Sequence, residues 1–301
     1  MSSHYLMRSQ MFVPGHNDRL LDSAAKSEAD VLLLDLEDSV QPTENKAIAR
    51  QKIIEYVKAG KFINHQVYPR INDRESGHLL KDLYALTIDG IDGFLYPKSE
   101  TGQDVYFIDK LLETIEYEKG YPEGKFKLIP LIETAAAVLN AQDICKASPR
   151  VVAISFGCED FISDLQGIHD KEHESLFVPR AMIAMAARAN NVIPIDTVHI
   201  NVHDLDDLEK NIITAKKLGF EGMLILNPKE LPLAHKYYSP SKEEVEDSEE
   251  MLKLFEESQK EGKGVAVKNG KFIGPPMVLM AKNILKRHYM IINKEINKII
   301  K

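Results

Sequence analysis

The sequence predicts an α/β fold of the (β/α)8 class, a TIM barrel, followed by a C-terminal helix–hairpin–helix extension. Short apolar runs of β-forming residues alternate with segments of helical period along residues 1–238, an order typical of parallel strands joined by helices. Several of the runs are apolar almost throughout, which suits strands covered on both faces. A doubly wound sheet is the competing arrangement, but the glycine-rich turn that a dinucleotide site places after the first strand is missing.

Each element of this alternation can be placed in order. The apolar runs end at polar or glycine-containing segments, which bound strands, and each helical segment spaces its apolar residues to form one buried face. The predicted strands are 9–14 (SQMFVP), 31–35 (VLLLD), 66–71 (QVYPRI), 93–97 (GFLYP), 126–132 (FKLIPLI), 151–156 (VVAISF), 195–200 (IDTVHI) and 222–226 (GMLIL). The predicted helices between them are 17–27, 46–59, 101–118, 135–146, 180–190 and 204–218.

The pattern changes after Tyr238, which gives a predicted barrel domain of residues 1–238 and an extension of residues 239–301. The extension begins with a long, charged segment typical of a surface helix. Two β-type runs then flank Asn269 and Gly270, a pair that favours a type I′ hairpin turn, and a last helix is predicted from near Met277. Because this segment is surplus to a barrel, it can pack on its own barrel or on a neighbouring subunit.

Composition narrows the class of partner. The 301 residues carry a net charge of −8 with an isoelectric point near 5.7, which argues against nucleic acid as a partner, because phosphate binding needs a basic surface. The two cysteines, Cys145 and Cys158, lack the spacing of a zinc site. The first residues contain no apolar signal region and no apolar run approaches membrane-spanning length. We therefore expect a cytoplasmic protein with no membrane partner.

In a barrel, catalytic side chains sit at the carboxyl ends of the strands. Almost every predicted strand is followed there by a charged or amide side chain. Helix N-capping explains some of them, but it does not explain Arg70, Lys98 or so many acids at once. The strand-end residues are, in chain order, His16 and Asn17; Asp35, Glu37 and Asp38; Arg70 and Asn72; Lys98; Glu133; Glu159 and Asp160; Asn201 and His203; and Asn227.

Glu133 and Asp160 are the strongest metal-ligand candidates. Both are carboxylates at the ends of adjacent predicted strands, and a few protein oxygens completed by water are the coordination that Mg²⁺ prefers. The alternative is that Glu133 forms a structural ion pair with Lys98 or Arg70. The residues themselves leave both possibilities open.

Arg70 follows the third predicted strand. A guanidinium at a barrel rim suits a bidentate grip on a substrate carboxylate. The alternative is an ion pair with Asp35 or Glu37, and both roles can coexist. The acids after the second strand, which would be costly to bury alone, would then share their rim with two cations, Arg70 and Lys98.

Eight short motifs stand in register along nearly the whole chain: FVPG (12–15), DLEDSV (35–40), RIN (70–72), YPKSET (96–101), LIET (131–134), GCEDF (157–161), DTVH (196–199) and GFEGMLILNPKEL (219–231). In these motifs the chain resembles the citrate lyase beta-subunit family, acyl-thioester lyases that are grouped with the HpcH/HpaI aldolases. The NPKEL segment is nearer the citrate lyase beta type than the HP form common elsewhere in the family.

The resemblance implies a Mg²⁺-dependent TIM barrel that cleaves or forms a carbon–carbon bond beside a thioester. The substrates of such proteins are citryl, malyl or citramalyl groups, or related hydroxy-carboxyacyl groups, on coenzyme A or an acyl carrier protein, and the products are a small oxo acid and an acyl thioester. By position in the motifs, Glu37 and Asp38 would bind waters around the ion. The expected site residues are Arg70, Glu37 and Asp38 for catalysis, Arg70, Glu133 and Lys98 for substrate binding, and Glu133 and Asp160 for Mg²⁺.

The extension departs from the family pattern at one residue. Relatives usually carry an Asp in a Gly-Lys-φ-φ-Asp-x-Pro segment (φ, apolar) that enters the site of a neighbouring subunit and serves proton transfer, whereas this chain reads NGKFIGPP with Gly274 at that position. Two alternatives to the thioester lyase follow: a pyruvate-type aldolase for free hydroxy-oxo acids, and a non-catalytic binding or scaffold subunit of a lyase complex. The resemblance also implies a homo-oligomer, a trimer or a hexamer, in which the extension is exchanged between subunits.

Overall fold

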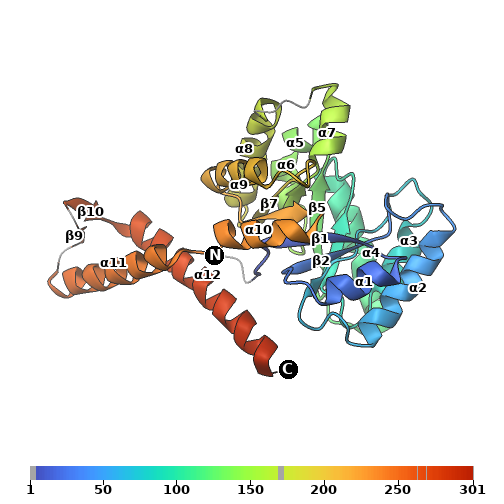
Figure 1. The fold of residues 1–301 in the computed structure, drawn as a ribbon, viewed down its shortest axis with the longest axis horizontal. Helices are drawn as coiled ribbons and strands as arrows, with labels where there is room; N and C mark the ends of the chain where they lie inside the picture. Colours follow the sequence, from blue (N-terminus) through green and yellow to red (C-terminus); the bar gives the residue numbers. More distant parts are fainter. Residues whose placement is uncertain (1–4, 169–172, 263, 269, 301) are drawn as a thin grey trace. The chain divides into compact units, whose positions relative to one another are not determined.

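The computed structural model describes residues 5–168, 173–262, 264–268 and 270–300 (Figure 1). These residues fall into two compact units, one of Tyr5–Ala234 and one from His235 onward. The division lies inside α10 (Leu231–Tyr238), close to the domain boundary predicted after Tyr238.

The first unit is built on one sheet of eight parallel strands. Neighbours in the sheet follow chain order, and β1 pairs with both β2 and β8, which is the connectivity of a barrel. The strands are β1 Ser9–Pro14, β2 Val31–Asp35, β3 Gln66–Val67, β4 Gly93–Tyr96, β5 Lys127–Ile132, β6 Ala153–Phe156, β7 Ile193–Asp196 and β8 Gly222–Ile225. The predicted α/β barrel class is confirmed.

The sheet closes into a barrel at Arg70. The regular part of β3 is short, yet the backbone beyond it stays hydrogen-bonded to both neighbouring strands. The Arg70 N–H donates to the Leu34 carbonyl of β2 at 3.0 Å, and the Leu95 N–H of β4 donates to the Pro69 carbonyl at 3.0 Å. Proline has no N–H to give to a ladder, so Pro69 interrupts the strand without opening the barrel.

The barrel interior follows the two-residue period of its strands. Val31 and Leu33 of β2 and Ile129 and Leu131 of β5 belong to one buried apolar cluster inside it. Successive side chains of a strand point to opposite faces. Continuing from these interior residues in steps of two therefore leads to the positions that face inward at the carboxyl rim. These positions are Asp35, Arg70, Glu133, Gly157 and Thr197.

Helices cover the outside of the sheet (Figure 1). Four predicted helices are found with small shifts at their ends: α1 Asp18–Ala25, α2 Asn45–Lys58, α4 Gly102–Lys119 and α9 Leu205–Leu218. The single helix predicted at 135–146 is instead two helices that meet at Asn140, and the helix predicted at 180–190 begins earlier and contains Pro179. These are α5 Ala135–Leu139, α6 Ala141–Lys146 and α8 Glu174–Ala189.

Three α-helices were not predicted from the sequence: α3 Leu79–Leu86, α7 Cys158–Leu165 and α10 Leu231–Tyr238. Each has eight residues, and so short a segment gives little helical period to detect. A single 3₁₀ turn, η1 (Pro228–Glu230), precedes α10.

The second unit has the predicted order of helix, hairpin and helix. Phe255 of the first helix, Ala266 and Ile273 of the hairpin and Val278 of the last helix form its small apolar core. Its elements are α11 Lys242–Lys260, the antiparallel strands β9 Ala266–Lys268 and β10 Lys271–Ile273, and α12 Pro275–Ile300. Asn269 of the predicted hairpin turn lies outside the described residues.

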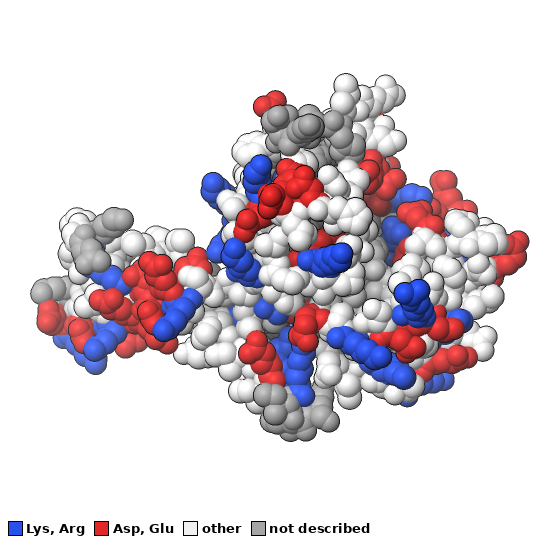
Figure 2. Space-filling model, in the orientation of Figure 1, with Lys and Arg blue, Asp and Glu red and all other residues white. Residues whose placement is uncertain are grey.

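Acidic and basic side chains are interspersed over the face of the molecule drawn in Figure 2. No described helix is both long and apolar enough to cross a bilayer.

Candidate active site

Most of the charged side chains predicted at the strand ends converge at one place on the rim, around the ends of β2, β3, β4 and β5. Arg70 is the centre of this group. Its guanidinium makes two hydrogen bonds to the Asp35 carboxylate, from Nε to Oδ1 at 2.6 Å and from Nη2 to Oδ2 at 2.7 Å. The remaining terminal nitrogen, Nη1, lies 3.0 Å from Glu37 Oε2 and 3.2 Å from Asp38 Oδ2.

Burial and charge act in opposite directions on this cluster. Burial alone would lower the pKa of Arg70, but the carboxylates of Asp35, Glu37 and Asp38 outweigh it and the net pKa is raised. Burial alone would raise the pKa of Asp35, and Arg70 together with hydrogen bonds from Ser39 and the Glu37 N–H lowers it. Both side chains of the pair are therefore charged. The structure contains the Arg70–Asp35 ion pair that the sequence offered as one of two roles for Arg70. The Phe12 ring lies under the guanidinium, 4.9 Å from ring centre to Cζ, a favourable cation–π contact.

Glu37 is buried beside this pair and its Oε1 atom has no hydrogen-bond partner among the described residues. The Lys98 ammonium is 3.5 Å from Oε1, which counts as an ion pair but is too long for a good hydrogen bond. Burial raises the pKa of Glu37 to about 7, and Asp38 and Asp35 add to the rise while Arg70 and Lys98 oppose it. An unpartnered buried carboxylate oxygen is costly unless a ligand or ion completes it.

Glu133 continues the inward face of β5 and is 4% exposed. Its Oε2 accepts a hydrogen bond from the Lys98 N–H at 2.7 Å. Burial raises its pKa to about 8; the Lys98 N–H and Arg70 lower it, and Glu37 and Asp160 raise it. The ion pair between Glu133 and the Lys98 or Arg70 side chain, considered from the sequence, is not found among the described residues.

Gly157 makes the space that Glu133 occupies. A Cβ atom on residue 157 would lie 2.7 Å from Glu133 Cγ and 3.1 Å from Glu133 Oε1, distances that no side chain tolerates without a shift. Only glycine therefore allows the end of β6 to pass beside the Glu133 carboxylate.

Asp160 lies in the first turn of α7, directly after β6, and is exposed. Its negative charge is one of the groups that raise the pKa of Glu133, so the two carboxylates share the same part of the rim. No group of three or more His, Cys, Asp or Glu side chains with metal-binding geometry occurs among the described residues. A site of two carboxylates completed by water remains compatible with this arrangement, and it is the coordination typical of Mg²⁺.

These observations fit a cation at Glu133 and Asp160. Glu133 is buried with like charges around it, and Glu37 Oε1 has no hydrogen-bond partner within the described part of the chain. A divalent ion would offset the repulsion around Glu133 and the burial of the Glu37 oxygen, because it favours the ionised form of the surrounding carboxyl groups.

Lys98 is the exposed cation of the rim. It has a left-handed backbone conformation, φ 51°, which is uncommon for a residue with a side chain and costs free energy. Its Nζ donates to Asp73 Oδ2 at 2.8 Å. The hydrogen bond with Asp73 and the Glu37 charge raise the pKa of Lys98 against the effect of burial. Three residues of the site were not predicted: Asp73, Phe12 and Ser39. Asp73 and Ser39 are each next to a predicted residue in the chain, and Phe12 lies four residues before His16.

The remaining strand-end residues have other roles. Asn17 and Asn227 cap helices, since their side chains accept from the N–H groups of Leu20 and Lys229. β7 ends at Asp196, before the predicted end at residue 200. Asn201 and His203 consequently lie in the exposed loop before α9 and do not reach the rim cluster. Asn72 is buried and points away from the rim, as described below.

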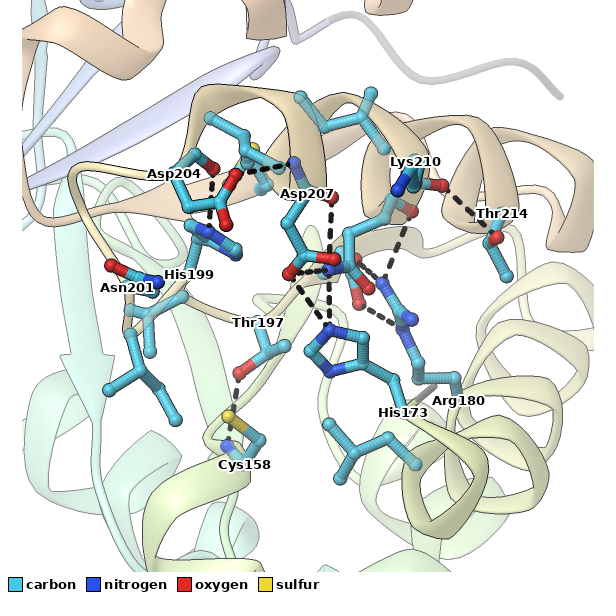
Figure 3. Close-up of a pocket in the computed structure, with 18 of the residues that line it drawn as sticks. Cys158, His173, Arg180, Thr197, His199, Asn201, Asp204, Asp207, Lys210 and Thr214 are labelled. Carbon is cyan, nitrogen blue, oxygen red and sulfur yellow. Dashed lines mark hydrogen bonds and ion pairs between the residues drawn. The ribbon is translucent and has the colours of Figure 1, made fainter. Parts of the chain in front are cut away.

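Figure 3 shows a separate cleft of about 940 Å³ between α8, α9 and the loop after β7. Its polar side chains hydrogen-bond one another, as Arg180 and Asp196 do, or bond neighbouring backbone groups. The Thr197 hydroxyl accepts from the Cys158 N–H at 3.0 Å, and His199 Nε2 lies 3.1 Å from the Asp204 carbonyl oxygen. Burial raises the pKa of the Cys158 thiol to about 12 and lowers that of His199. A thiol that stays protonated at neutral pH lacks the properties of a nucleophile, so Cys158 is not a candidate for one.

A family model described as HpcH/HpaI aldolase/citrate lyase matches residues 8–228. The chain is 31% identical over 286 residues to the citrate lyase subunit beta of Leuconostoc mesenteroides subsp. cremoris, covering 95% of this chain and 94% of that protein. It is 30% identical over 305 residues to the L-malyl-CoA/beta-methylmalyl-CoA lyase of Rhodobacter capsulatus, covering 95% of both.

Solved structures of proteins named as citrate lyase beta subunits or CitE are also similar to this chain. The chain matches the crystal structure of CitE from Mycobacterium tuberculosis in complex with magnesium, acetoacetate and coenzyme A with a TM-score of 0.71 at 26% identity, over 93% of this chain and 97% of that one. A citrate lyase beta subunit complexed with oxaloacetate and magnesium, also from M. tuberculosis, matches with a TM-score of 0.63 at 26% identity, over 77% of this chain and 97% of that one.

Proposed function

The chain belongs to the HpcH/HpaI aldolase/citrate lyase family, whose members similar to it are acyl-CoA lyases, and we propose that it is a Mg²⁺-dependent carbon–carbon lyase. The substrate would be a citryl-, citramalyl- or malyl-CoA-like hydroxy-carboxyacyl thioester, carried by coenzyme A or an acyl carrier protein. The products would be a small oxo acid and an acyl thioester. The observation that supports this most directly is the single rim cluster of Arg70, Glu37, Glu133 and Asp160.

Glu133 and Asp160 are the residues that would hold Mg²⁺. When bound, the ion would polarise the substrate oxygen and bind the neighbouring carboxylate. Glu37 and Asp38 lie beside this position and are suited to accept hydrogen bonds from waters around the ion.

Arg70 would hold the oxo-acid carboxylate and offset its negative charge. Its Nη1 is shared by Glu37 and Asp38, and the Asp38 side chain is 68% exposed at a longer distance of 3.2 Å. Asp38 is thus the partner that a substrate carboxylate can displace from Arg70 at little cost, because an exposed ion pair contributes little free energy. Asp35 keeps the rest of the guanidinium in place.

Glu37 would transfer the proton. Cleavage requires a base to take the proton of the substrate hydroxyl while the electrons of the breaking carbon–carbon bond move into the thioester enolate. The same proton is then returned to the enolate carbon, which completes the acyl thioester. Glu37 has the free acceptor atom, Oε1, that this step needs, and Lys98 lies beside it as a cation that can attract the carboxylate or the thioester oxygen.

We further propose the cellular setting that the family likeness suggests: a cytoplasmic homo-oligomer, a trimer or hexamer, which can also associate with other subunits of a lyase complex. The barrel of residues 1–238 would carry the site, and the extension of residues 239–301 would pack on a neighbouring subunit. Ultracentrifugation at several protein concentrations tests the oligomer, and a monomer at every concentration would contradict it.

Gly274 favours a second candidate function. It stands between β10 and α12, at the position where relatives usually carry an Asp, and a Cβ atom there would have only Pro276 Cδ within contact, at 3.9 Å. The space for a side chain is thus present and the acid is missing. An aldolase for free hydroxy-oxo acids, or a non-catalytic subunit of a lyase complex, would need no such acid. Calorimetry with coenzyme A separates the aldolase from the lyase, since the aldolase predicts no binding. Pull-down of acyl carrier or transferase subunits would favour the non-catalytic subunit.

The main test is turnover. Malyl-, citramalyl- and citryl-CoA are each incubated with the protein and Mg²⁺, and release of glyoxylate, pyruvate or oxaloacetate is followed with and without EDTA. We expect release from one of them that EDTA abolishes and added Mg²⁺ restores. Glu118→Gln, an exposed acid on α4, serves as the control for Glu133→Gln, and it should retain full activity. Failure to cleave all three thioesters would overturn the proposal.

A further inference from the structure

Lys46 occupies a position in α2 that the helical pattern reserves for an apolar side chain. The buried residues of this helix are Lys46, Ala49, Ile53 and Val57, which is the spacing of one helix face packed against the barrel. Lys46 is only 7% exposed. A lysine is seldom buried to this degree unless its ammonium is fully partnered.

The Lys46 ammonium has three partners, one for each of its N–H donors. It donates to the Leu36 carbonyl at 2.9 Å, to the Glu37 carbonyl at 3.0 Å and to Asn72 Oδ1 at 2.5 Å. All three acceptors are uncharged, and no carboxylate of the described residues forms an ion pair with Lys46. Its contacts are therefore with the backbone of the turn that carries Glu37, and with the side chain of Asn72, two residues after Arg70.

Further hydrogen bonds hold Asn72, one of the three acceptors, in place. The Asn72 amide donates to Asp82 Oδ2 at 2.6 Å, and the Asn72 N–H donates to the same oxygen at 2.9 Å. Asp82 Oδ1 accepts from Arg50, one helical turn after Lys46, at 2.7 Å. Asp82 and Asn72 are almost fully buried, so the network ties α2, the end of the third strand and α3 into one rigid arrangement.

We propose that Lys46 is a positioning residue for Glu37. By holding the carbonyls of Leu36 and Glu37, the ammonium keeps the Glu37 carboxylate 3.0 Å from Arg70 and 3.5 Å from Lys98. Loss of the ammonium leaves the Leu36 carbonyl and Asn72 Oδ1 unpaired, and it leaves the Glu37 carbonyl with only the Val40 N–H, at 3.3 Å. The turn can regain the lost partners only by moving toward water. This inference rests on the proposed function, in which Glu37 transfers the proton.

The test compares Lys46→Met with Lys52→Met. Lys52 lies on the same helix but forms a surface ion pair with Asp18, so it controls for loss of a lysine from α2. For the thioester that the wild type cleaves, we expect Lys46→Met to lower kcat about tenfold or more with a nearly unchanged KM, because a small displacement of a reacting group is costly. Lys52→Met should stay within about twofold of the wild type. Lys46→Gln, which keeps two donors, replaces Lys46→Met if that variant does not fold.

A double-mutant cycle separates positioning from general loss of structure. If Lys46 acts through Glu37, Lys46→Met should reduce kcat little further in a Glu37→Gln background, because the group it positions is already inactive. Losses that multiply in the double variant, or a kcat unchanged in Lys46→Met, would overturn the inference.

A wild type that cleaves none of the thioesters would overturn the proposed function without deciding the role of Lys46. Crystal structures of the wild type and the Lys46 variant then give the answer. A Glu37 carboxylate that leaves Arg70 in the variant supports positioning, and one that keeps its place contradicts it.

Discussion

The Arg70 guanidinium and the Asp35 carboxylate form a buried bidentate pair, with parallel contacts of 2.6 and 2.7 Å. The two side chains come from adjacent strands, and the Arg70 backbone itself closes the barrel between β2 and β4. The same residue thus completes the fold and presents its terminal nitrogen to the site. Changes at this pair should affect stability and function together.

Asp35→Asn should destabilise the protein by about 3 kcal/mol, because it leaves a buried guanidinium facing an amide in place of a carboxylate. Denaturant unfolding of the wild type and the variant measures this difference. Asp18→Asn, which removes the exposed partner of Lys52, is the control and should change the free energy of unfolding far less. Equal effects of the two substitutions would mean that burial of the Arg70 pair has no energetic consequence.

Glu133→Gln should weaken Mg²⁺ binding by about 100-fold or more, since it replaces a charged oxygen ligand by an amide of the same shape. Isothermal titration with Mg²⁺ measures the affinity. Because burial raises the pKa of Glu133 to about 8, the wild-type affinity should rise with pH through neutrality and binding should release protons. An affinity that is equal in Glu133→Gln and the wild type would exclude Glu133 as a ligand.

Gly157→Ala should impair Mg²⁺ binding and turnover by about tenfold or more without unfolding the protein. The new methyl group would meet Glu133 Cγ at 2.7 Å, so the carboxylate must move, and displaced catalytic groups lose much of their effect. Gly167→Ala is the matched control, because its Cβ would make only ordinary contacts, at 3.5 Å and beyond. If both alanine variants bind Mg²⁺ like the wild type, the close approach at Gly157 does not constrain the site.

Glu230→Gln should remove a pH-dependent loss of stability. Glu230 is fully buried, its Oε1 has no hydrogen-bond partner among the described residues, and burial raises its pKa from 4.5 to about 7, against hydrogen bonds from the N–H groups of Leu226 and Asn227. The folded state therefore binds this proton more tightly than the unfolded state. The resulting stabilisation is complete below the unfolded pKa and is lost as pH rises through about 7.

Unfolding measurements between about pH 5 and about pH 8 check this sign. The wild type should lose about 2 kcal/mol relative to Glu230→Gln over that range, since glutamine has no proton to lose. Glu118→Gln should follow the wild type. A Glu230→Gln variant whose stability parallels the wild type at every pH would show that Glu230 stays ionised in the fold.

The sequence was sufficient for the barrel and for most of the rim. The two-residue period of β2 runs from Val31 and Leu33 to Asp35, and that of β5 runs from Ile129 and Leu131 to Glu133. Strand geometry fixes which face each of these residues occupies, so the placement of the acids at the mouth of the barrel could be predicted. The prediction that Asn201 and His203 lie at a strand end was wrong, because β7 ends at Asp196, earlier than its apolar run suggested.

Which side chains contact one another was decided only by the tertiary structure. The order of residues left Asp35, Glu37 and Glu133 as candidates to pair with Arg70. In the folded chain the guanidinium makes its bidentate contact with Asp35 and a single contact with Glu37 Oε2, and Glu133 lies beside Gly157. Among the described residues, Glu37 Oε1 has no hydrogen-bond partner. Lys46 was not singled out from the sequence, although its place in the apolar face of α2 was a signal that could have been used. The face that a residue occupies on a strand or helix depends on the local backbone geometry, and residues close in the sequence determine that geometry. Pairing at the rim depends on distances between strands far apart in the chain, and these exist only once the barrel has closed.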